Sequence, residues 1–266
     1  LPKLRPAAPA AGRRVAVVGG GPGGMSAAYF LGRSGVDVTV FERRDALGGI
    51  VRHVIPAFRI PGEAIDNDVR LMEAMGEKVE LNTEVKDVQE LFAQGFTHVI
   101  LATGAWQKGS AGLEYGEEHN VIEFLEAAKK APDTLNLGRH VVVIGGGNVS
   151  MDAVRTAKRM GAEKVSILYR RRRHDMTALP EEIEGAVAEG IELLTLKAPS
   201  SIDVDENGRV RGIWAAPQMV SAIKDGRAGI QPTGEPDVYI PCDVLIRAIG
   251  QDIETSHFEE AGVPVQ

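Results

Sequence analysis

Apolar runs and helical stripes alternate along the first hundred residues. Residues 15–18 are a short, wholly apolar run that predicts a buried strand, a glycine-rich turn follows, and residues 25–33 predict a helix. Residues 36–41 predict the next strand. After Pro61 and Gly62 apolar residues recur at three- and four-residue spacing up to about Met75, which predicts a second helix. This alternation is typical of a parallel sheet covered by helices on both faces.

The same order of patterns returns about 125 residues later. Residues 141–144 and 165–169 predict strands, and residues 148–160 between them predict a helix. Pro180 before two glutamates predicts a further helix start. Residues 200–241 mix short strands with turns and predict an antiparallel region. The fold class we expect is α/β, with two Rossmann-like dinucleotide-binding domains.

Composition narrows the class of protein. The chain has 266 residues, 44% of them hydrophobic, which suffices for a full core. A net charge of −7 and a pI near 5.5 argue against a nucleic-acid partner. No apolar run approaches the roughly 20 residues of a membrane span. Residues 1–14 are rich in proline and alanine, without an apolar signal-peptide core, and predict a linker. We therefore expect a cytoplasmic protein with no membrane span.

The single cysteine, Cys242, limits the redox chemistry of this sequence. One thiol excludes an internal disulfide and the dithiol pair that disulfide reductases use. It also cannot supply the usual four thiolates of an iron–sulfur cluster, so any cluster lies elsewhere. Because Cys242 starts an apolar run, we expect a structural role for it.

The first glycine-rich turn satisfies the dinucleotide fingerprint G-x-G-x-x-G at Gly19, Gly21 and Gly24. The first glycine makes the tight turn, the second admits a pyrophosphate, and the third lets the helix pack on the strand. Glu42 follows at the end of the next strand, where a carboxylate accepts a hydrogen bond from a ribose hydroxyl. This context predicts FAD or NAD rather than a simple surface turn.

The second glycine-rich turn has Gly145 and Gly147 in place, with Ser150 where glycine or alanine is usual. Arg170 and Arg171 lie at the end of the strand that follows this turn, which is the position of Glu42 after the first turn. Cations at this position favour a 2′-phosphate, so the second site predicts NADP. The alternative is that the arginines form an ordinary solvated charge run.

Several motifs in order give the sequence a family resemblance from about Arg14 to its end. They are VVGGGPGGMSA (17–27), GGIVRHVIPAFRIP (48–61), ATGAW (102–106), VIGGGNVSMD (143–152), residues 169–176 and AIGQ (248–251). With them the chain resembles the glutamate synthase small-subunit-like NAD(P)H/FAD oxidoreductase family, which includes the flavin domains of dihydropyrimidine dehydrogenase. Within this family, the flavin/iron–sulfur subunits of selenate reductase look most similar.

The resemblance implies an NADP domain inserted into an FAD domain. It places the FAD-binding domain at 15–106 and 245–266, and the NAD(P)H-binding domain at 107–244. It implies FAD contacts from Gly19, Gly21, Pro22, Gly24, Glu42, Arg43, Gly49, Ile50, Arg59, Val85, Ala102, Thr103 and Gly104. It implies NADP(H) contacts from Gly146, Gly147, Asn148, Val149, Arg170, Arg171, Ala248, Ile249 and Gly250. Ile50 and Val85 also fit plain core positions, and Arg59 fits a local ion pair.

The sequence departs from the family at three places. Met176-Thr177-Ala178 replaces the frequent Met-Pro-Ala, which leaves the contacts of that loop open. The cysteine-rich N-terminal domain and the last FAD motif, a Gly-Asp pair, are missing, so relative to the family the chain is truncated at both ends. We therefore expect an FAD-binding domain that is incomplete at its C-terminus and binds FAD weakly.

The function that the resemblance implies is an NADPH-dependent flavoprotein oxidoreductase module. Hydride would pass from NADPH to FAD, and electrons then to iron–sulfur centres on another domain or subunit, which is the expected partner. The cofactors carry this chemistry, so we expect no catalytic side chain and no metal ligand. His53 fits either a place near the flavin or a structural role. The alternative function is a non-catalytic nucleotide-binding module of a larger redox complex.

Overall fold

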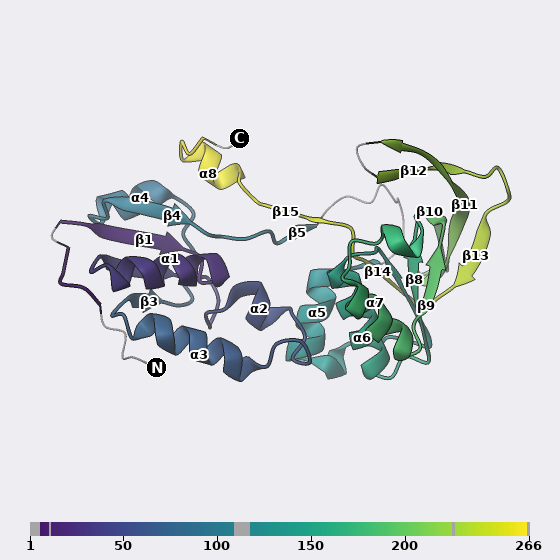
Figure 1. The fold of residues 1–266 in the computed structure, drawn as a ribbon, viewed down its shortest axis with the longest axis horizontal. Helices are drawn as coiled ribbons and strands as arrows, with labels where there is room; N and C mark the ends of the chain where they lie inside the picture. The colour runs from purple at the N-terminus through teal and green to yellow at the C-terminus, as the bar shows by residue number, and fades with distance from the viewer. Residues whose placement is uncertain (1–5, 11, 109–117, 225–226, 265–266) are drawn as a thin grey trace. The chain divides into compact units, whose positions relative to one another are not determined.

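The structure is a computed structural model that describes residues 6–10, 12–108, 118–224 and 227–264 (Figure 1). Residues 1–5 and 11 of the expected linker lie outside the described residues. The chain divides into two compact units, which are described separately. Unit 1 comprises Leu1–Gln107 with Gln251–Gln266, and unit 2 comprises Lys108–Gly250.

Unit 1 is built on a four-stranded parallel sheet with the order β3-β2-β1-β4. Its strands are β1 (Arg14–Val18), β2 (Asp37–Phe41), β3 (Lys78–Glu80) and β4 (His98–Leu101). On the central strand β1, Val15 and Val17 pack in one hydrophobic cluster, while Ala16 and Val18 pack in another on the opposite face. Both faces are buried, which explains why β1 is apolar at every position after Arg14.

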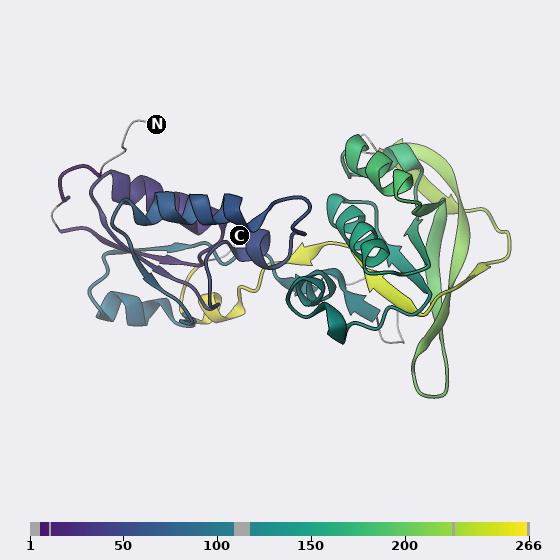
Figure 2. The ribbon, with the colours of Figure 1, turned by 90° about the horizontal axis from the view of Figure 1, so that it is seen from below.

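Helices cover both faces of this sheet (Figure 2). One face carries α1 (Pro22–Arg33) and α3 (Gly62–Glu73), and the other carries α4 (Val88–Ala93). The remaining helices of unit 1 are short, α2 (Gly49–His53) and α8 (Ser256–Glu260). In α1, Met25 and Ala28 face the sheet, and the helix starts at Pro22, three residues before its apolar stripe.

The opening segment is held against the end of α1. The backbone N–H of Ala7 donates to Arg33 O at 2.9 Å, and that of Ala10 donates to Gly35 O at 2.7 Å. Gly35 has φ +83°, which a glycine adopts without strain after a helix. The part of the expected linker that the structure describes is thus hydrogen-bonded to unit 1, and Arg14 already belongs to β1.

Unit 2 contains a five-stranded parallel sheet with the order β6-β14-β7-β8-β9. Its strands are β6 (Glu118–Asn120), β7 (His140–Ile144), β8 (Lys164–Tyr169), β9 (Glu192–Thr195) and β14 (Val244–Arg247). Its helices are α5 (Val121–Lys130), η1 (Pro132–Thr134), α6 (Asn148–Arg159), η2 (Arg173–Asp175) and α7 (Pro180–Ala188). The predicted second strand–helix–strand set is β7–α6–β8.

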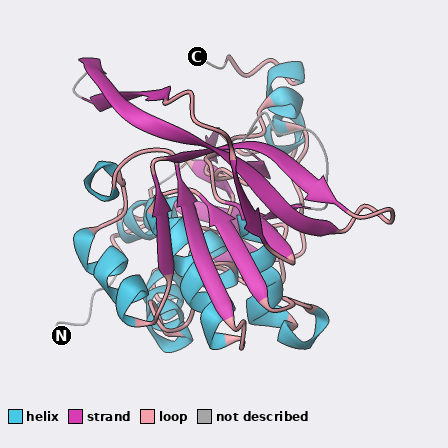
Figure 3. Cartoon of the chain, turned by 90° about the vertical axis from the view of Figure 1, so that its right-hand side faces the viewer, coloured by secondary structure: helices cyan, strands magenta, loops and turns pink. Residues whose placement is uncertain are grey.

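The antiparallel strands expected for residues 200–241 are present, and their sheet packs on the parallel sheet (Figure 3). It consists of β10 (Lys197–Val204), β11 (Val210–Lys224), β12 (Arg227–Pro232) and β13 (Val238–Pro241). Ile213 and Ile240 from these strands pack against Val142, Leu168 and Leu245 of the parallel sheet. Their shared cluster joins the two sheets into one unit.

The expected domain boundary at residue 245 is wrong by six residues. β14 lies between β6 and β7 in unit 2, with Leu245 paired to Val142. Its first three residues, Val244, Leu245 and Ile246, are buried, so the strand needs a sheet interior with both faces covered. The chain returns to unit 1 only at Gln251. There β15 (Gln251–Asp252) pairs with β5 (Gln107–Lys108), the segment by which the chain leaves unit 1.

Cys242 lies at 3% exposure in the cluster that joins the two sheets of unit 2. Burial raises the pKa of its thiol to about 12, with a smaller contribution from the charge of Asp243. The expected structural role agrees with this environment, because a reactive thiol needs a low pKa and solvent access.

We predict that Cys242 of the native protein is inert to thiol reagents at pH 8. A pKa of about 12 leaves a thiolate fraction on the order of one in ten thousand, against about a quarter for an ordinary thiol. Ellman's reagent should therefore label one thiol per chain only after unfolding in urea. Labelling of the folded protein at the rate of the unfolded protein would contradict the prediction.

Candidate functional site

The glycine turn of unit 1 follows β1 and is closed by backbone contacts. Gly19 has φ +106°, and a Cβ built on it would lie 2.3 Å from the carbonyl oxygen of Ala102. A Cβ on Gly24 would lie 1.8 Å from the carbonyl oxygen of Gly19. No side chain fits at either position. The first and third glycines of the fingerprint therefore fix how closely β1, β4 and α1 approach.

A second glycine pair lies over the middle of this turn. Gly49 has φ +52°, and a Cβ on it would lie 2.7 Å from the Cα of Gly21. The N–H of Gly48 donates to Gly20 O at 2.8 Å and holds the two segments together. The surface they leave is bare backbone at the start of α1, the 12-residue helix. Such a cradle accepts a phosphate group close to helix N–H groups, so the residues present fit a dinucleotide pyrophosphate.

Glu42 joins the end of β2 to the same turn. Its side chain is 5% exposed; Oε2 accepts from the N–H of Gly20 at 2.7 Å, and Oε1 accepts from the N–H of Arg44 at 2.8 Å. Each carboxylate oxygen keeps further acceptor capacity beyond these bonds. Glu42 therefore both positions the turn and presents a negative charge at the end of β2.

A cavity of about 580 Å³ opens at the carboxyl ends of β1, β2 and β4. It brings together eleven of the residues expected to bind FAD: Gly19, Gly21, Pro22, Glu42, Arg43, Gly49, Ile50, Val85, Ala102, Thr103 and Gly104. Gly24 and Arg59 do not line it. Gly24 is buried under the turn, and Arg59 follows α2, with its backbone N–H donating to Pro56 O.

Trp106 lines the cavity and was not among the expected site residues. The guanidinium carbon of Arg44 lies 4.3 Å from the centre of the Trp106 ring, and that of Arg43 lies 5.5 Å from it. A Cβ on Gly104 would lie 3.3 Å from Trp106 Nε1. Two cation–π contacts thus hold an aromatic wall beside Glu42. The signal available in the sequence was the aromatic residue that follows Ala105, just after the Ala-Thr-Gly turn.

Ten more lining residues were not among the expected site residues. They come from the ends of β1 and β2, the start of α1, the loop after β2, the segment after β3, the turn after β4, and the segment from residue 254 into α8: Val18, Phe41, Gly23, Arg44, Thr83, Glu84, Lys86, Ala105, Glu254 and Phe258. Glu254 and Phe258 follow the other lining residues by more than 140 positions in the sequence, and no motif marks them.

The glycine turn of unit 2 repeats the first. Gly145 has φ +144°, and a Cβ on it would lie 2.4 Å from the carbonyl oxygen of Ala248 and 2.6 Å from Ser150 Oγ. A Cβ on Gly146 would meet the Tyr169 ring at 2.6 Å. Gly147 is the N-cap of α6. This turn therefore also leaves a bare backbone cradle at a helix start, which fits a second pyrophosphate.

Ser150, in the place of the third glycine, is fully buried beside Gly145. Its backbone N–H donates to Gly147 O at 3.0 Å, but its Oγ has no hydrogen-bond partner within the described residues. The hydroxyl is small enough for the helix to pack on the strand, and it leaves a polar group unsatisfied.

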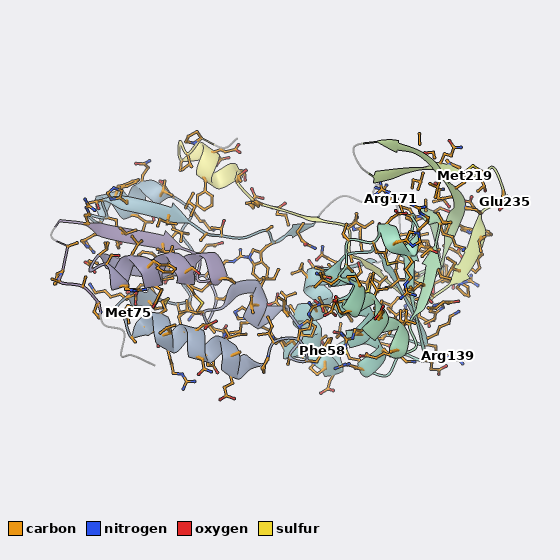
Figure 4. All side chains as sticks on the ribbon, viewed as in Figure 1. Phe58, Met75, Arg139, Arg171, Met219 and Glu235 are labelled. Atoms are coloured by element: carbon orange, nitrogen blue, oxygen red, sulfur yellow. The ribbon has the colours of Figure 1, made fainter. Side chains whose placement is uncertain are left out.

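The arginines follow β8, and Arg171 is labelled in Figure 4. Arg170 is exposed, whereas Arg171 is half-buried, with its Nε buried and without a partner in the described part of the chain. Arg172 forms an ion pair with Asp175, Nε to Oδ2 at 2.8 Å. A buried guanidinium N–H without an acceptor fits a site that receives an anionic group.

The other residues expected around NADP(H) surround the turn of unit 2. Asn148 and Val149 start α6, and Asn148 Oδ1 accepts from the N–H of Leu179 at 2.9 Å. Ala248, Ile249 and Gly250 follow β14, at the same edge of the sheet as the turn.

His53, the candidate for a place near the flavin, is buried in α2. Its Nε2 lies 3.3 Å from Ala46 O, and it does not line the cavity.

Within the described residues, no group of three or more His, Cys, Asp or Glu side chains is placed to hold a metal ion. The same part of the chain contains no helix long and apolar enough to cross a bilayer.

Comparisons with known proteins agree with this geometry. The sequence profile described as "Pyridine nucleotide-disulphide oxidoreductase" matches residues 13–266. YgfK of Escherichia coli (strain K12) is 38% identical over 266 residues, covering 98% of this chain and 25% of YgfK. The glutamate synthase [NADPH] small chain of the same strain is 33% identical, covering 90% of this chain and 54% of the small chain. The chain thus spans a quarter to about half of these relatives.

A solved structure shares the fold. FprA from Mycobacterium tuberculosis in complex with NADPH superimposes with a TM-score of 0.76 at 16% identity, covering 90% of this chain and 71% of FprA. The expected α/β fold with two Rossmann-like domains is confirmed. Since unit 2 lies in one continuous stretch between two parts of unit 1, the expected insertion of one domain into the other is present as well.

We predict that Ser150→Ala stabilises the protein. The substitution removes a buried hydroxyl without a partner, so unfolding should cost about 1 kcal/mol more. Ser166→Ala is the matched control, because Ser166 is equally buried but its Oγ donates to Glu192 Oε2 at 3.0 Å; this variant should lose about 1 to 3 kcal/mol. Urea unfolding measures both. A Ser150→Ala protein less stable than the parent would contradict the assignment.

We predict that Trp106 reports FAD binding by fluorescence. The chain has two tryptophans, Trp106 and Trp214, so Trp214→Phe leaves Trp106 as the sole emitter. Because Trp106 lines the cavity, FAD bound there should quench more than half of its emission. The reciprocal Trp106→Phe variant reports on unit 2 and serves as the control. Unchanged Trp106 emission at FAD concentrations that saturate absorbance-detected binding would place the flavin elsewhere.

Proposed function

Because the chain belongs to the pyridine nucleotide-disulphide oxidoreductase family, we propose that it is the NADPH- and FAD-binding module of a larger redox enzyme. In this proposal, unit 1 binds FAD in its 580 Å³ cavity and unit 2 binds NADPH at its glycine turn. The module would deliver electrons to iron–sulfur centres on another domain or subunit.

Family membership confirms several expectations. The resemblance to the glutamate synthase small-subunit-like family is correct, and the chain is an oxidoreductase of the pyridine nucleotide class. FAD and NADP(H) are the cofactors of this class, as expected. Which residue contacts which cofactor remains our proposal, with the same residues as those expected from the sequence.

The observation that carries the division of cofactors is the charge at the end of the second strand in each unit. Glu42 directly follows β2, and its carboxylate is buried and held by two backbone N–H groups. This charge suits a free ribose hydroxyl and repels a 2′-phosphate. Arg170 and Arg171 stand after β8, where their charges attract a 2′-phosphate. FAD and NADPH therefore fit units 1 and 2 in that order, and the reverse assignment would place a phosphate beside Glu42.

The residues of each unit bind and orient their cofactor rather than transfer protons. When bound, NADPH supplies a hydride that FAD accepts and passes on as electrons. The glycine turns bring backbone N–H groups to each pyrophosphate, and Trp106 with Arg44 walls the cavity of unit 1. Glu42 fixes the turn against β2. We assign no acid or base to the described side chains.

Our proposal of an iron–sulfur acceptor rests on the thiol chemistry and on the relatives. The single cysteine is buried and has a raised pKa, so it offers no dithiol route for electrons. The chain spans 54% of a glutamate synthase small chain, so such relatives contain further polypeptide.

A cytoplasmic location stays a prediction from the sequence.

The competing function is a non-catalytic nucleotide-binding module. It predicts that both nucleotides bind but that NADPH does not reduce the flavin. The purified chain should be reconstituted with FAD under anaerobic conditions and mixed with NADPH. Bleaching of the flavin absorbance near 450 nm supports the redox module, and persistence of the oxidised spectrum with NADPH bound supports the competing function.

We predict that Arg170→Ala and Arg171→Ala each weaken NADPH binding and spare NADH. Loss of a charge-assisted bond to the 2′-phosphate costs about 1.5 to 3 kcal/mol, which is roughly 10- to 150-fold in Kd. Arg139→Ala is the matched control, because Arg139 precedes the amino end of β7 and pairs with Glu163. Its Kd for NADPH should match the parent. Equal losses for NADPH and NADH would remove the 2′-phosphate from this position.

A further inference from the structure

The loop after β8 contains four consecutive arginines that are not equivalent. Arg172 makes a two-bonded ion pair with Asp175, with Nε to Oδ2 at 2.8 Å and Nη2 to Oδ1 at 3.0 Å. No ion pair to a carboxylate is formed by Arg170, Arg171 or Arg173 within the described residues. One arginine of the run is thus neutralised locally, and three keep their charge for another group.

Asp175 holds this loop through its backbone as well as its side chain. Its N–H donates to Arg172 O at 3.0 Å, and its Oδ2 also accepts from the N–H of Arg172 at 3.2 Å. The hydroxyl of Tyr169 donates to Asp175 O at 2.7 Å. The Tyr169 ring in turn packs on Gly146, where no Cβ fits. Asp175 therefore connects the arginine run to the end of β8 and, through Tyr169, to the glycine turn.

The far end of the loop is fastened to the same turn. The N–H of Ala178 donates to Gly146 O at 3.0 Å, and the N–H of Leu179 donates to Asn148 Oδ1 at 2.9 Å. Met176 and Ala178 are buried. The Arg171 carbonyl accepts from the N–H of Leu196 at 3.1 Å, which fixes the run from the side of β9. The loop is thus a closed structure between the arginines and the glycine turn, and the Arg172–Asp175 pair lies at its centre.

We propose that Asp175 is a positioning residue that sets nucleotide specificity: by binding Arg172 it folds the loop so that Arg170 and Arg171 meet the adenosine 2′-phosphate. Asp175 itself contacts no phosphate in this proposal and acts through the arginines. The inference rests on the proposed NADPH binding of unit 2. The Arg172 guanidinium holds the pKa of Asp175 below its usual range, so the carboxylate is charged at neutral pH.

Simple electrostatics gives the opposite expectation. A carboxylate close to a phosphate site repels the phosphate, so removing Asp175 should tighten binding if only net charge mattered. If Asp175 positions the loop, its removal weakens binding although the site becomes more positive. The sign of the change therefore separates the two effects.

The test is calorimetric titration of the full chain with NADP⁺ and with NAD⁺. Asp175→Ala and Arg172→Ala should each raise the Kd for NADP⁺ about five- to tenfold, the size of one weakened charge-assisted contact, and leave the Kd for NAD⁺ within about twofold. The double variant should lose no more than the larger single loss, because both changes break one pair. Arg172→Lys keeps the charge but cannot make the two parallel bonds, so it should also weaken NADP⁺ binding. Arg173→Ala is the matched control and should lose less than Arg172→Ala.

Unchanged or tighter NADP⁺ binding by Asp175→Ala, or losses that add in the double variant, would overturn the proposal. A second readout does not depend on nucleotide preference. Hydrogen exchange of the backbone amides of Ala178 and Leu179 should accelerate in Asp175→Ala, and unchanged exchange would also overturn it. A parent protein that does not prefer NADP⁺ over NAD⁺ would refute the proposed NADPH function instead, while the exchange data still decide whether Asp175 orders the loop.

Discussion

The structure depends on one repeated constraint, the contact between a glycine Cα and the carbonyl that follows a neighbouring strand. In unit 1, Gly19 lies under the Ala102 carbonyl after β4, and in unit 2, Gly145 lies under the Ala248 carbonyl after β14. Any side chain at either glycine would collide with backbone, which cannot move without separating two paired strands. The contact sets the height at which each turn leaves the sheet. It therefore sets the position of the N-terminus, with its free N–H groups, of the helix that follows each turn, α1 in unit 1 and α6 in unit 2.

The two units share this constraint but differ in the chemistry at its side. In unit 1 the residue after the second strand, Glu42, is bound to the turn itself, because its carboxylate accepts a hydrogen bond from the N–H of Gly20. In unit 2 the corresponding strand continues into a loop that carries its own counter-charge, Asp175, and returns to the turn through Ala178. A buried anion therefore closes the first site, whereas a partly neutralised cationic loop borders the second. The same backbone arrangement thus carries a negative charge beside the turn in unit 1 and positive charges beside the turn in unit 2.

Local signals in the sequence predicted most of the frame. The strands before each glycine turn were predicted because they are apolar on both faces, and the antiparallel region because its strands are short and separated by turns. α1 begins at Pro22, whereas the sequence predicted a start at Met25. The prediction missed the first turn because Pro-Gly-Gly resembles a loop, although a proline at the start of a helix loses no hydrogen bond. The boundary at residue 245 failed for another reason. An apolar strand fits the interior of either sheet equally well, and only the pairing of β14 with β7 decides between them.

The candidate site contains residues that sequence patterns predict and residues that they do not. Residues that must be glycine, or that end a strand with a charge, follow from the chemistry of a dinucleotide and were expected. Glu254 and Phe258 line the cavity through tertiary contacts that no spacing encodes. The Arg172–Asp175 pair is close in sequence, but its meaning depends on Tyr169 and Gly146, which lie on a strand end and a turn. Four adjacent arginines look equivalent in a sequence because composition adds charges. Folding distinguishes them, because a carboxylate three residues away can satisfy only the arginine whose geometry matches it.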